Sequence, residues 1–191
     1  MLSMSFRNEL RSPDSNAALL PKYNWEEWYK NVVPAMDRIN AANKDVLIFM
    51  SGLNFDTTMA PITTGANLGS GTVFNKANFA YADKLVIELH NYQTTSTDCN
   101  AIKSGLYNGG YNGMNLTDPK VKNHFPVLLT EFGHAQTAAD YASVYSTCLK
   151  DYLGGLKGGW MYWVLSGTYY IREGRQDADE SWGKTNPSLR L

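Results

Sequence analysis

Charged residues are scarce in this sequence, and neither sign dominates. Lys, Arg, Asp and Glu together make up 18% of the 191 residues, and the formal net charge is -1. A chain without a basic excess lacks the electrostatic basis for binding nucleic acid or an anionic membrane surface. We therefore expect neither nucleic acid nor a membrane as a partner.

Long apolar runs and nucleotide-binding motifs are also missing. No apolar run reaches the roughly 18 residues that are needed to span a bilayer. No basic segment followed by an apolar one opens the chain, so these residues include no secretory signal peptide. Gly65–Gly71 is rich in glycine but lacks the Lys-Ser/Thr of a phosphate-binding loop. We therefore expect no nucleotide, and no other cofactor.

Cysteine is limited to Cys99 and Cys148, and the residues around them show no metal-ligand spacing. We expect no metal site. The two thiols either form one long-range disulfide or remain unlinked structural cysteines, and we favour the disulfide.

Aromatic residues, in contrast, reach 13%, with five Trp and twelve Tyr. A surface with little charge and many Tyr, Trp, Asn and Gly side chains suits neutral polar ligands such as sugars. A core that is simply rich in aromatic residues explains the same composition, so composition alone leaves both interpretations open.

Short apolar runs alternate with helical patterns along the chain. The runs predict strands over 1–8, 45–50 and 84–90, one beginning at 125, and one over 159–165. Apolar residues at spacings of three and four predict a helix over 24–43, capped by Asn24, and a second over about 138–152. Residues 93–122 read as a long loop, and the tail from 166 has no clear period. Strand–helix alternation is typical of parallel βα units, and no boundary for a second domain is visible.

Two glutamates, Glu9 and Glu131, each follow a predicted strand. Active sites of parallel α/β folds lie at the carboxyl ends of their strands. Two carboxyl groups at such an edge are the minimum apparatus for retaining glycoside hydrolysis, with the groups about 5–5.5 Å apart. Either residue taken singly is more often an ordinary exposed glutamate.

Four short motifs resemble glycoside hydrolase family 5, the cellulase-type (β/α)8 barrels. Arg7–Leu10 resembles the Asn-Glu-Pro type motif that ends the fourth strand of that family. His90–Tyr92 resembles its His-x-Tyr after the sixth strand, Thr130–Gly133 its Gly-Glu-Phe-Gly nucleophile motif, and Trp160–Trp163 its Trp-rich eighth strand. The motifs occur in family order, one to a strand, across essentially the whole chain.

This resemblance implies roles for six residues. Glu9 is the expected acid/base and Glu131 the expected nucleophile. Asn8 is expected to hydrogen-bond the sugar 2-hydroxyl, and His90 to line the site near the acid/base. Tyr92 is expected to steady the nucleophile through its phenol, and Trp163 to stack on the apolar face of a pyranose.

The chain also departs from the family. A (β/α)8 barrel takes roughly 250 residues, whereas this sequence corresponds to the fourth to eighth strands only. The family's arginine beside the nucleophile and a histidine after its third strand have no counterpart here. We expect residues 1–191 to form a single, incomplete catalytic domain of the α/β class: a partial (β/α)8 barrel of about five parallel strands without its first three βα units.

The expected function is retaining hydrolysis of a β-linked polysaccharide, most readily cellulose-type β-glucan, impaired in this truncated form. Mannan and other β-glycosides are alternative substrates within the same family. A carbohydrate-binding remnant without turnover and a self-contained α/β interaction protein are alternatives from other classes. The enzyme class and the expected disulfide imply an extracellular location.

Overall fold

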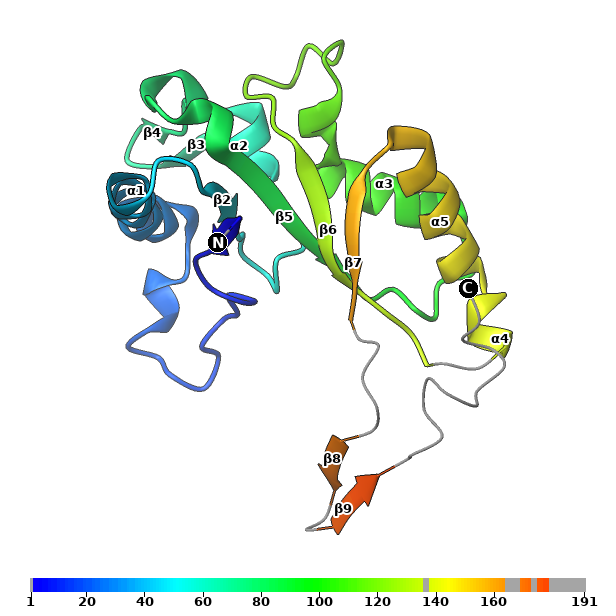
Figure 1. Ribbon diagram of the computed structural model, residues 1–191. Helices are drawn as coiled ribbons and strands as arrows, with labels where there is room; N and C mark the ends of the chain where they lie inside the picture. Colours follow the sequence, from blue (N-terminus) through cyan, green and yellow to red (C-terminus); the bar gives the residue numbers. More distant parts are fainter. Residues whose placement is uncertain (1, 136–137, 164–168, 173–174, 179–191) are drawn as a thin grey trace.

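The computed structural model describes residues 2–135, 138–163, 169–172 and 175–178. Its centre is a curled, fully parallel sheet with the strand order β1-β2-β5-β6-β7 (Figure 1). The bounds of these strands are Ser3–Ser5 (β1), Leu47–Met50 (β2), Leu85–Asn91 (β5), Val127–Phe132 (β6) and Gly159–Tyr162 (β7). The predicted fold, a partial (β/α) barrel of about five parallel strands, is confirmed.

Helices connect these strands and cover the outer face of the sheet (Figure 1). Their bounds are Trp25–Ala42 (α1), Ala60–Thr64 (α2), Cys99–Gly109 (α3), Ala138–Tyr141 (α4) and Val144–Leu156 (α5), with 3-10 turns at Leu20–Lys22 (η1), Lys76–Asn78 (η2), Ala82–Lys84 (η3) and Tyr111–Met114 (η4). None of the described helices is both long and apolar enough to cross a membrane.

Helix α1 begins where the sequence predicts. The Asn24 side chain accepts a hydrogen bond from the Glu27 N–H at 2.9 Å, and Glu26 and Glu27 lie in the first turn, near the positive end of the helix dipole. Trp28, Val32 and Met36 form its buried face. Burial of this stripe against β2 fixes the helix on the sheet.

The core lies between the sheet and the helices. Alternate residues of the central strands, such as Leu85, Ile87 and Leu89 of β5, are at most 1% exposed and pack with the buried faces of α1, α3 and α5. The intervening residues of the same strand face the opposite, concave side. The sheet therefore carries an apolar layer outside and a more polar surface inside.

The expected long loop over 93–122 is wrong, because this segment contains α3 and η4. Asp98 caps α3 by accepting from the Asn100 N–H, and Ile102 and Leu106 are buried one turn apart. Three glycines, Gly105, Gly109 and Gly110, weaken the helical signal in the sequence. Tertiary packing of the apolar stripe outweighs that low propensity.

Three further details of the structure differ from the sequence expectations. The helix expected over 138–152 is divided into α4 and α5, and Ser143 caps the second by accepting from the Ser146 N–H. Two antiparallel hairpins were not predicted: β3 (Asn67–Gly69) with β4 (Thr72–Val73), and β8 (Tyr169–Arg172) with β9 (Arg175–Ala178). The strand expected over 159–165 is shorter, because β7 ends at Tyr162; residues 164–165 lie outside the described part of the chain.

Candidate active site

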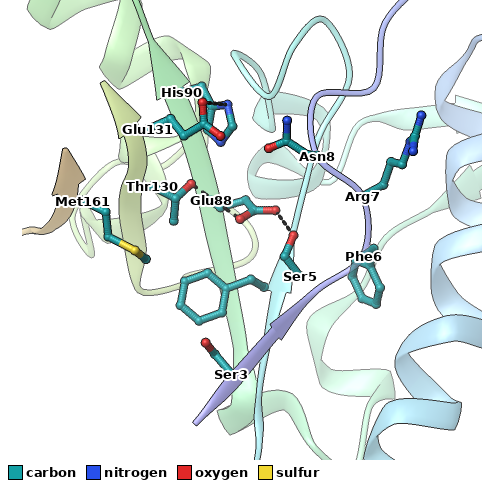
Figure 2. Close-up of a pocket in the computed structure, with 11 residues that line it drawn as sticks. Ser3, Ser5, Phe6, Arg7, Asn8, Glu88, His90, Thr130, Glu131 and Met161 are labelled. Carbon is teal, nitrogen blue, oxygen red and sulfur yellow. Dashed lines mark hydrogen bonds and ion pairs between the residues drawn. The ribbon is translucent and has the colours of Figure 1, made fainter. Parts of the chain in front are cut away.

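A cavity of about 400 Å³ lies on the concave side of the sheet. Segments that are far apart in sequence meet there: β1 with the residues after it, β2, β5, β6 and β7 (Figure 2). Its lining is Ser3, Ser5, Phe6, Arg7, Asn8, Phe49, Glu88, His90, Thr130, Glu131 and Met161. This is the polar inner surface that strand alternation produces.

An irregularity in β6 aims Glu131 into this cavity. Leu89 of β5 pairs with Leu129, but the next residue, His90, pairs with Glu131, so Thr130 is an extra residue on β6. Such a bulge turns the following side chain towards the face that it would otherwise avoid. Thr130 and Glu131 consequently both line the cavity, although they are adjacent in sequence.

The two glutamates predicted from the sequence meet through His90. The His90 Nδ1 atom lies 3.1 Å from Glu9 Oε1 and 3.6 Å from Glu131 Oε2. One carboxylate oxygen of Glu9 and one of Glu131 are within 4.8 Å of each other. The His90 side chain is only 3% exposed, against 21% for Glu9 and 16% for Glu131. Both carboxyl groups therefore remain partly exposed while the imidazole between them is buried; Glu131 lines the cavity, and Glu9 lies next to it through His90.

Tyr92 contacts the second glutamate. Its hydroxyl donates a hydrogen bond of 3.0 Å to Glu131 Oε2. Burial and the neighbouring Glu131 carboxylate raise the pKa of the Tyr92 phenol above its ordinary value. The phenol thus stays protonated at neutral pH and remains a donor to the carboxylate.

Asn8 and Trp163 lie at the margins of the site. Asn8 is exposed and lines the cavity beside Arg7 (Figure 2). Trp163 directly follows β7 and is 59% exposed, and it is not one of the residues that line the cavity. Its backbone N–H donates to the Phe132 carbonyl at 2.8 Å, which fixes it next to the Glu131 segment.

Two acidic residues of the site were not predicted. Glu88 is 5% exposed and projects from β5 into the cavity, where its carboxylate accepts a hydrogen bond from the Ser5 hydroxyl and has Thr130 Oγ1 at 3.5 Å (Figure 2). Asp56 is fully buried, and its Oδ2 accepts from the Glu9 N–H at 2.9 Å. Alternation along β5 could have identified Glu88 as facing inwards. No local pattern marks Asp56, which lies in a segment without periodicity.

Among the described residues, one group has ligand atoms spaced closely enough to hold a cation. It consists of Glu9, His90 and Glu131. Two of these atoms already have partners within the protein, since His90 Nδ1 contacts Glu9 and Glu131 Oε2 accepts from Tyr92. Paired carboxyl groups beside a histidine and a phenol suit proton transfer. We assign no ion to this group.

A curled parallel sheet with two carboxyl groups at the carboxyl ends of its strands defines a partial (β/α) barrel with a candidate acid–base site. The family model described as cellulase (glycosyl hydrolase family 5) matches residues 2–168, so the chain belongs to glycoside hydrolase family 5. A glycosyl hydrolase 5 family protein from Chamaecyparis obtusa is 26% identical over 200 residues, covering 97% of this chain and 32% of the relative.

Solved structures show the same fold. A β-glucanase from Saccharophagus degradans superposes with a TM-score of 0.58 at 17% identity, covering 87% of this chain and 46% of that one. The catalytic domain of endoglucanase Cel5A from Thermobifida fusca, in complex with cellotetraose, gives a TM-score of 0.51 at 17% identity, with coverages of 90% and 47%. The chain thus spans about a third of the curated relative and under half of these solved chains.

Proposed function

We propose that this chain carries the site for retaining hydrolysis of a β-linked glucan. The observation that supports this most directly is the short distance, within 4.8 Å, between carboxylate oxygens of Glu9 and Glu131. Retaining glycosidases place their two carboxyl groups about 5–5.5 Å apart, whereas inverting enzymes need about 6.5–9.5 Å to admit a water molecule. A spacing within 4.8 Å supports the retaining class over the inverting one.

In the first step, Glu131 attacks the anomeric carbon as an ionised carboxylate, and the bond to the leaving oxygen breaks. Glu9 gives its proton to that oxygen, so the departing sugar leaves as a neutral alcohol. In the second step, Glu9 takes a proton from water, the water oxygen bonds to the anomeric carbon, and Glu131 is released. The two inversions together retain the configuration.

The surrounding groups assist these steps. The Tyr92 hydroxyl orients the Glu131 carboxylate through its hydrogen bond. His90, beside both glutamates, sets the position of the Glu9 carboxyl group. Asn8 binds the 2-hydroxyl of the sugar, and the exposed Trp163 ring stacks on the apolar face of a pyranose. The β-glucanase and the cellotetraose-bound endoglucanase that share the fold support β-1,4-linked glucose as the substrate unit.

Hydrolysis of β-glucan and of mannan by the purified chain tests this function. We expect glucan to be the better substrate and the first product to be the β-anomer, as read by proton NMR. Glu131→Gln should lower turnover by at least about a thousandfold, because the amide cannot act as the nucleophile. Glu9→Gln should slow aryl glycosides with poor leaving groups much more than dinitrophenyl glycosides, which need no proton.

The matched control is Glu27→Gln on α1, which makes the same chemical change outside the cavity and should leave turnover unchanged. An α-anomeric first product, or full activity in Glu131→Gln, would contradict the assignment.

A second candidate function is carbohydrate binding without turnover. Within the described part of the chain, His90 is the single Lys, Arg or His side chain with a nitrogen within 4 Å of the Glu131 carboxylate. The arginine that the family resemblance implies at this point is therefore not supplied by those residues. Retention of cellotetraose on the chain, with no product formed, would favour this candidate over hydrolysis.

We also propose an extracellular location. Cys99 and Cys148 form a disulfide with a Cα–Cα distance of 5.5 Å. Disulfides persist mainly in oxidising compartments. Expression with secretion signals and without them, followed by comparison of the folded yield, would test whether the chain depends on an oxidising environment.

A further inference from the structure

One buried residue, Asp56, connects the two segments that carry the proton-handling groups. Its Oδ2 atom accepts a hydrogen bond from the backbone N–H of Glu9 at 2.9 Å. Its own carbonyl oxygen accepts from the backbone N–H of His90, also at 2.9 Å. The same Oδ2 faces the His90 Nε2 atom at 3.8 Å. Asp56, which follows β2, thus contacts both Glu9, in the segment after β1, and His90, near the end of β5.

The backbone at this junction adopts an unfavourable conformation. Asn54, Phe55 and Asp56 have consecutive φ values of 54°, 59° and 56°, and Glu9 has a φ of 50°. The left-handed region is costly for residues other than glycine and persists only where surrounding contacts impose it. Strain of this kind is concentrated at functional sites.

Specific hydrogen bonds hold the strained segment in place. The Phe55 N–H donates to the Leu10 carbonyl at 2.9 Å, and the Asn54 N–H donates to the Tyr23 hydroxyl. The first of these bonds also ties the segment to the residue that follows Glu9. The Asp56 loop and the Glu9 loop are therefore fixed to each other at two successive points.

The Asp56 carboxyl group is buried and only partly hydrogen-bonded. It is 0% exposed, and its Oδ1 atom has no hydrogen-bond partner among the described groups. Burial raises the pKa of Asp56 to about 7, opposed by the Glu9 N–H and His90 and reinforced by the nearby Glu88 and Glu9 carboxyl groups. An apolar or amide side chain could occupy position 56 without placing an acidic group in the interior. The acid is therefore suited to a role in the electrostatics of the site.

We propose that Asp56 is a positioning residue for the acid/base: its carboxyl group holds the Glu9 backbone and faces the His90 nitrogen opposite the one that contacts Glu9. It acts through Glu9 and His90 and does not touch the substrate. The inference rests on the proposed role of Glu9. It extends that role, since it identifies what sets the direction of the Glu9 carboxyl group.

The test is NMR spectroscopy of the full 191-residue chain, which does not require turnover. An amide proton that is bonded to a carboxyl group moves downfield when that group ionises. We expect the Glu9 amide proton to show such a step centred near pH 7. In Asp56→Asn the step should vanish, while the Glu9 amide stays protected from hydrogen exchange because the side-chain oxygen still accepts its bond.

In Asp56→Ala, exchange of the Glu9 amide should speed up at least about tenfold, because the acceptor is lost. The matched control is Asp37→Asn, which alters a hydrogen-bonded aspartate of α1 that contacts Tyr81 and should leave the Glu9 step intact. A step that persists in Asp56→Asn would assign it to Glu9 or His90 and overturn the proposal, as would the absence of any step in the wild-type chain.

Unchanged exchange in Asp56→Ala would overturn it as well. If that variant does not fold, the Asp56→Asn spectrum alone decides. A failed hydrolysis assay with a positive NMR result would disprove the enzymatic function and leave the contact between Asp56 and Glu9 established.

Discussion

His90 illustrates how single residues could and could not be predicted from the sequence. The motif His90–Tyr92 marks His90 as a site residue in the sequence, as other motifs mark Glu9 and Glu131. The structure brings these three residues together. Asp56 lies 47 residues from Glu9, in a segment with no periodic pattern. Its importance comes from a strained loop and a long-range hydrogen bond, and neither leaves a trace in local sequence.

Gly133 provides a test at the residue scale, because it lies against the backbone of Trp163. A Cβ atom at position 133 would come within 2.0 Å of the Trp163 carbonyl oxygen. Gly133→Ala should therefore displace the Trp163 backbone and destabilise the chain by about 1–3 kcal/mol, the usual cost of overpacking. Urea unfolding measures this loss of free energy, and affinity for cellotetraose should fall with it.

Gly154→Ala is the matched control for that substitution. A Cβ atom at Gly154, within α5, meets nothing within 4 Å. The same change there should stabilise the chain by about 0.5–1 kcal/mol, because alanine loses less backbone entropy than glycine in a helix. If both substitutions changed the free energy of unfolding by the same amount, the close contact between Gly133 and Trp163 would not explain the effect of Gly133→Ala.

At the scale of elements, apolar runs predicted the sheet well and the outer helices less well. A strand buried on both faces is apolar throughout, so β2 is visible as a continuous run, while β5 is marked by the apolar residues of its outer face and by Val86. Helix α3 was missed because Gly105 and Gly109 lie within it and its stability comes from outside its own sequence. Its partner is α5, to which Cys99 and Cys148 join it covalently.

The disulfide should contribute substantially to stability. It closes a loop between residues 49 apart, for which the chain-entropy relation gives about 4 kcal/mol. We expect the Cys99→Ala/Cys148→Ala variant to lose about that much free energy of unfolding. Denaturation by urea measures the change, and wild-type protein treated with reductant should behave in the same way.

Removal of the disulfide should also affect the candidate active site. Tyr145 of α5 donates a hydrogen bond to the Asn91 carbonyl, which lies between His90 and Tyr92. Looser anchoring of α5 should speed up amide exchange at the end of β5. Unaltered stability in the double alanine variant would show that packing of α5 alone holds the outer layer.

At the scale of the whole molecule, the sheet is a barrel wall with two edges. A closed barrel gives every strand two neighbours. Here β1 pairs with β2 alone, and β7 pairs with β6 alone, among the described strands. Exposed apolar side chains lie on both edge strands, including Met4 at 46% and Met161 at 48%. Unpaired, apolar edges are templates for pairing with another chain.

The 191-residue chain should therefore self-associate through these edges. We expect its apparent mass in analytical ultracentrifugation to rise with concentration towards about 100 μM, the range in which exposed strand edges promote association. Met4→Lys combined with Met161→Lys should suppress this rise, because a charge on an edge strand opposes edge-to-edge pairing. Leu116→Lys is the matched control, since Leu116 is 77% exposed and lies outside the sheet. A monomeric wild-type chain across the whole range, or equal suppression by Leu116→Lys, would mean that the edges are not the cause. Suppression by the edge substitutions alone would show that β1, the strand that leads to Glu9, and β7, the neighbour of the strand that holds Glu131, expose the edges along which the barrel wall is open.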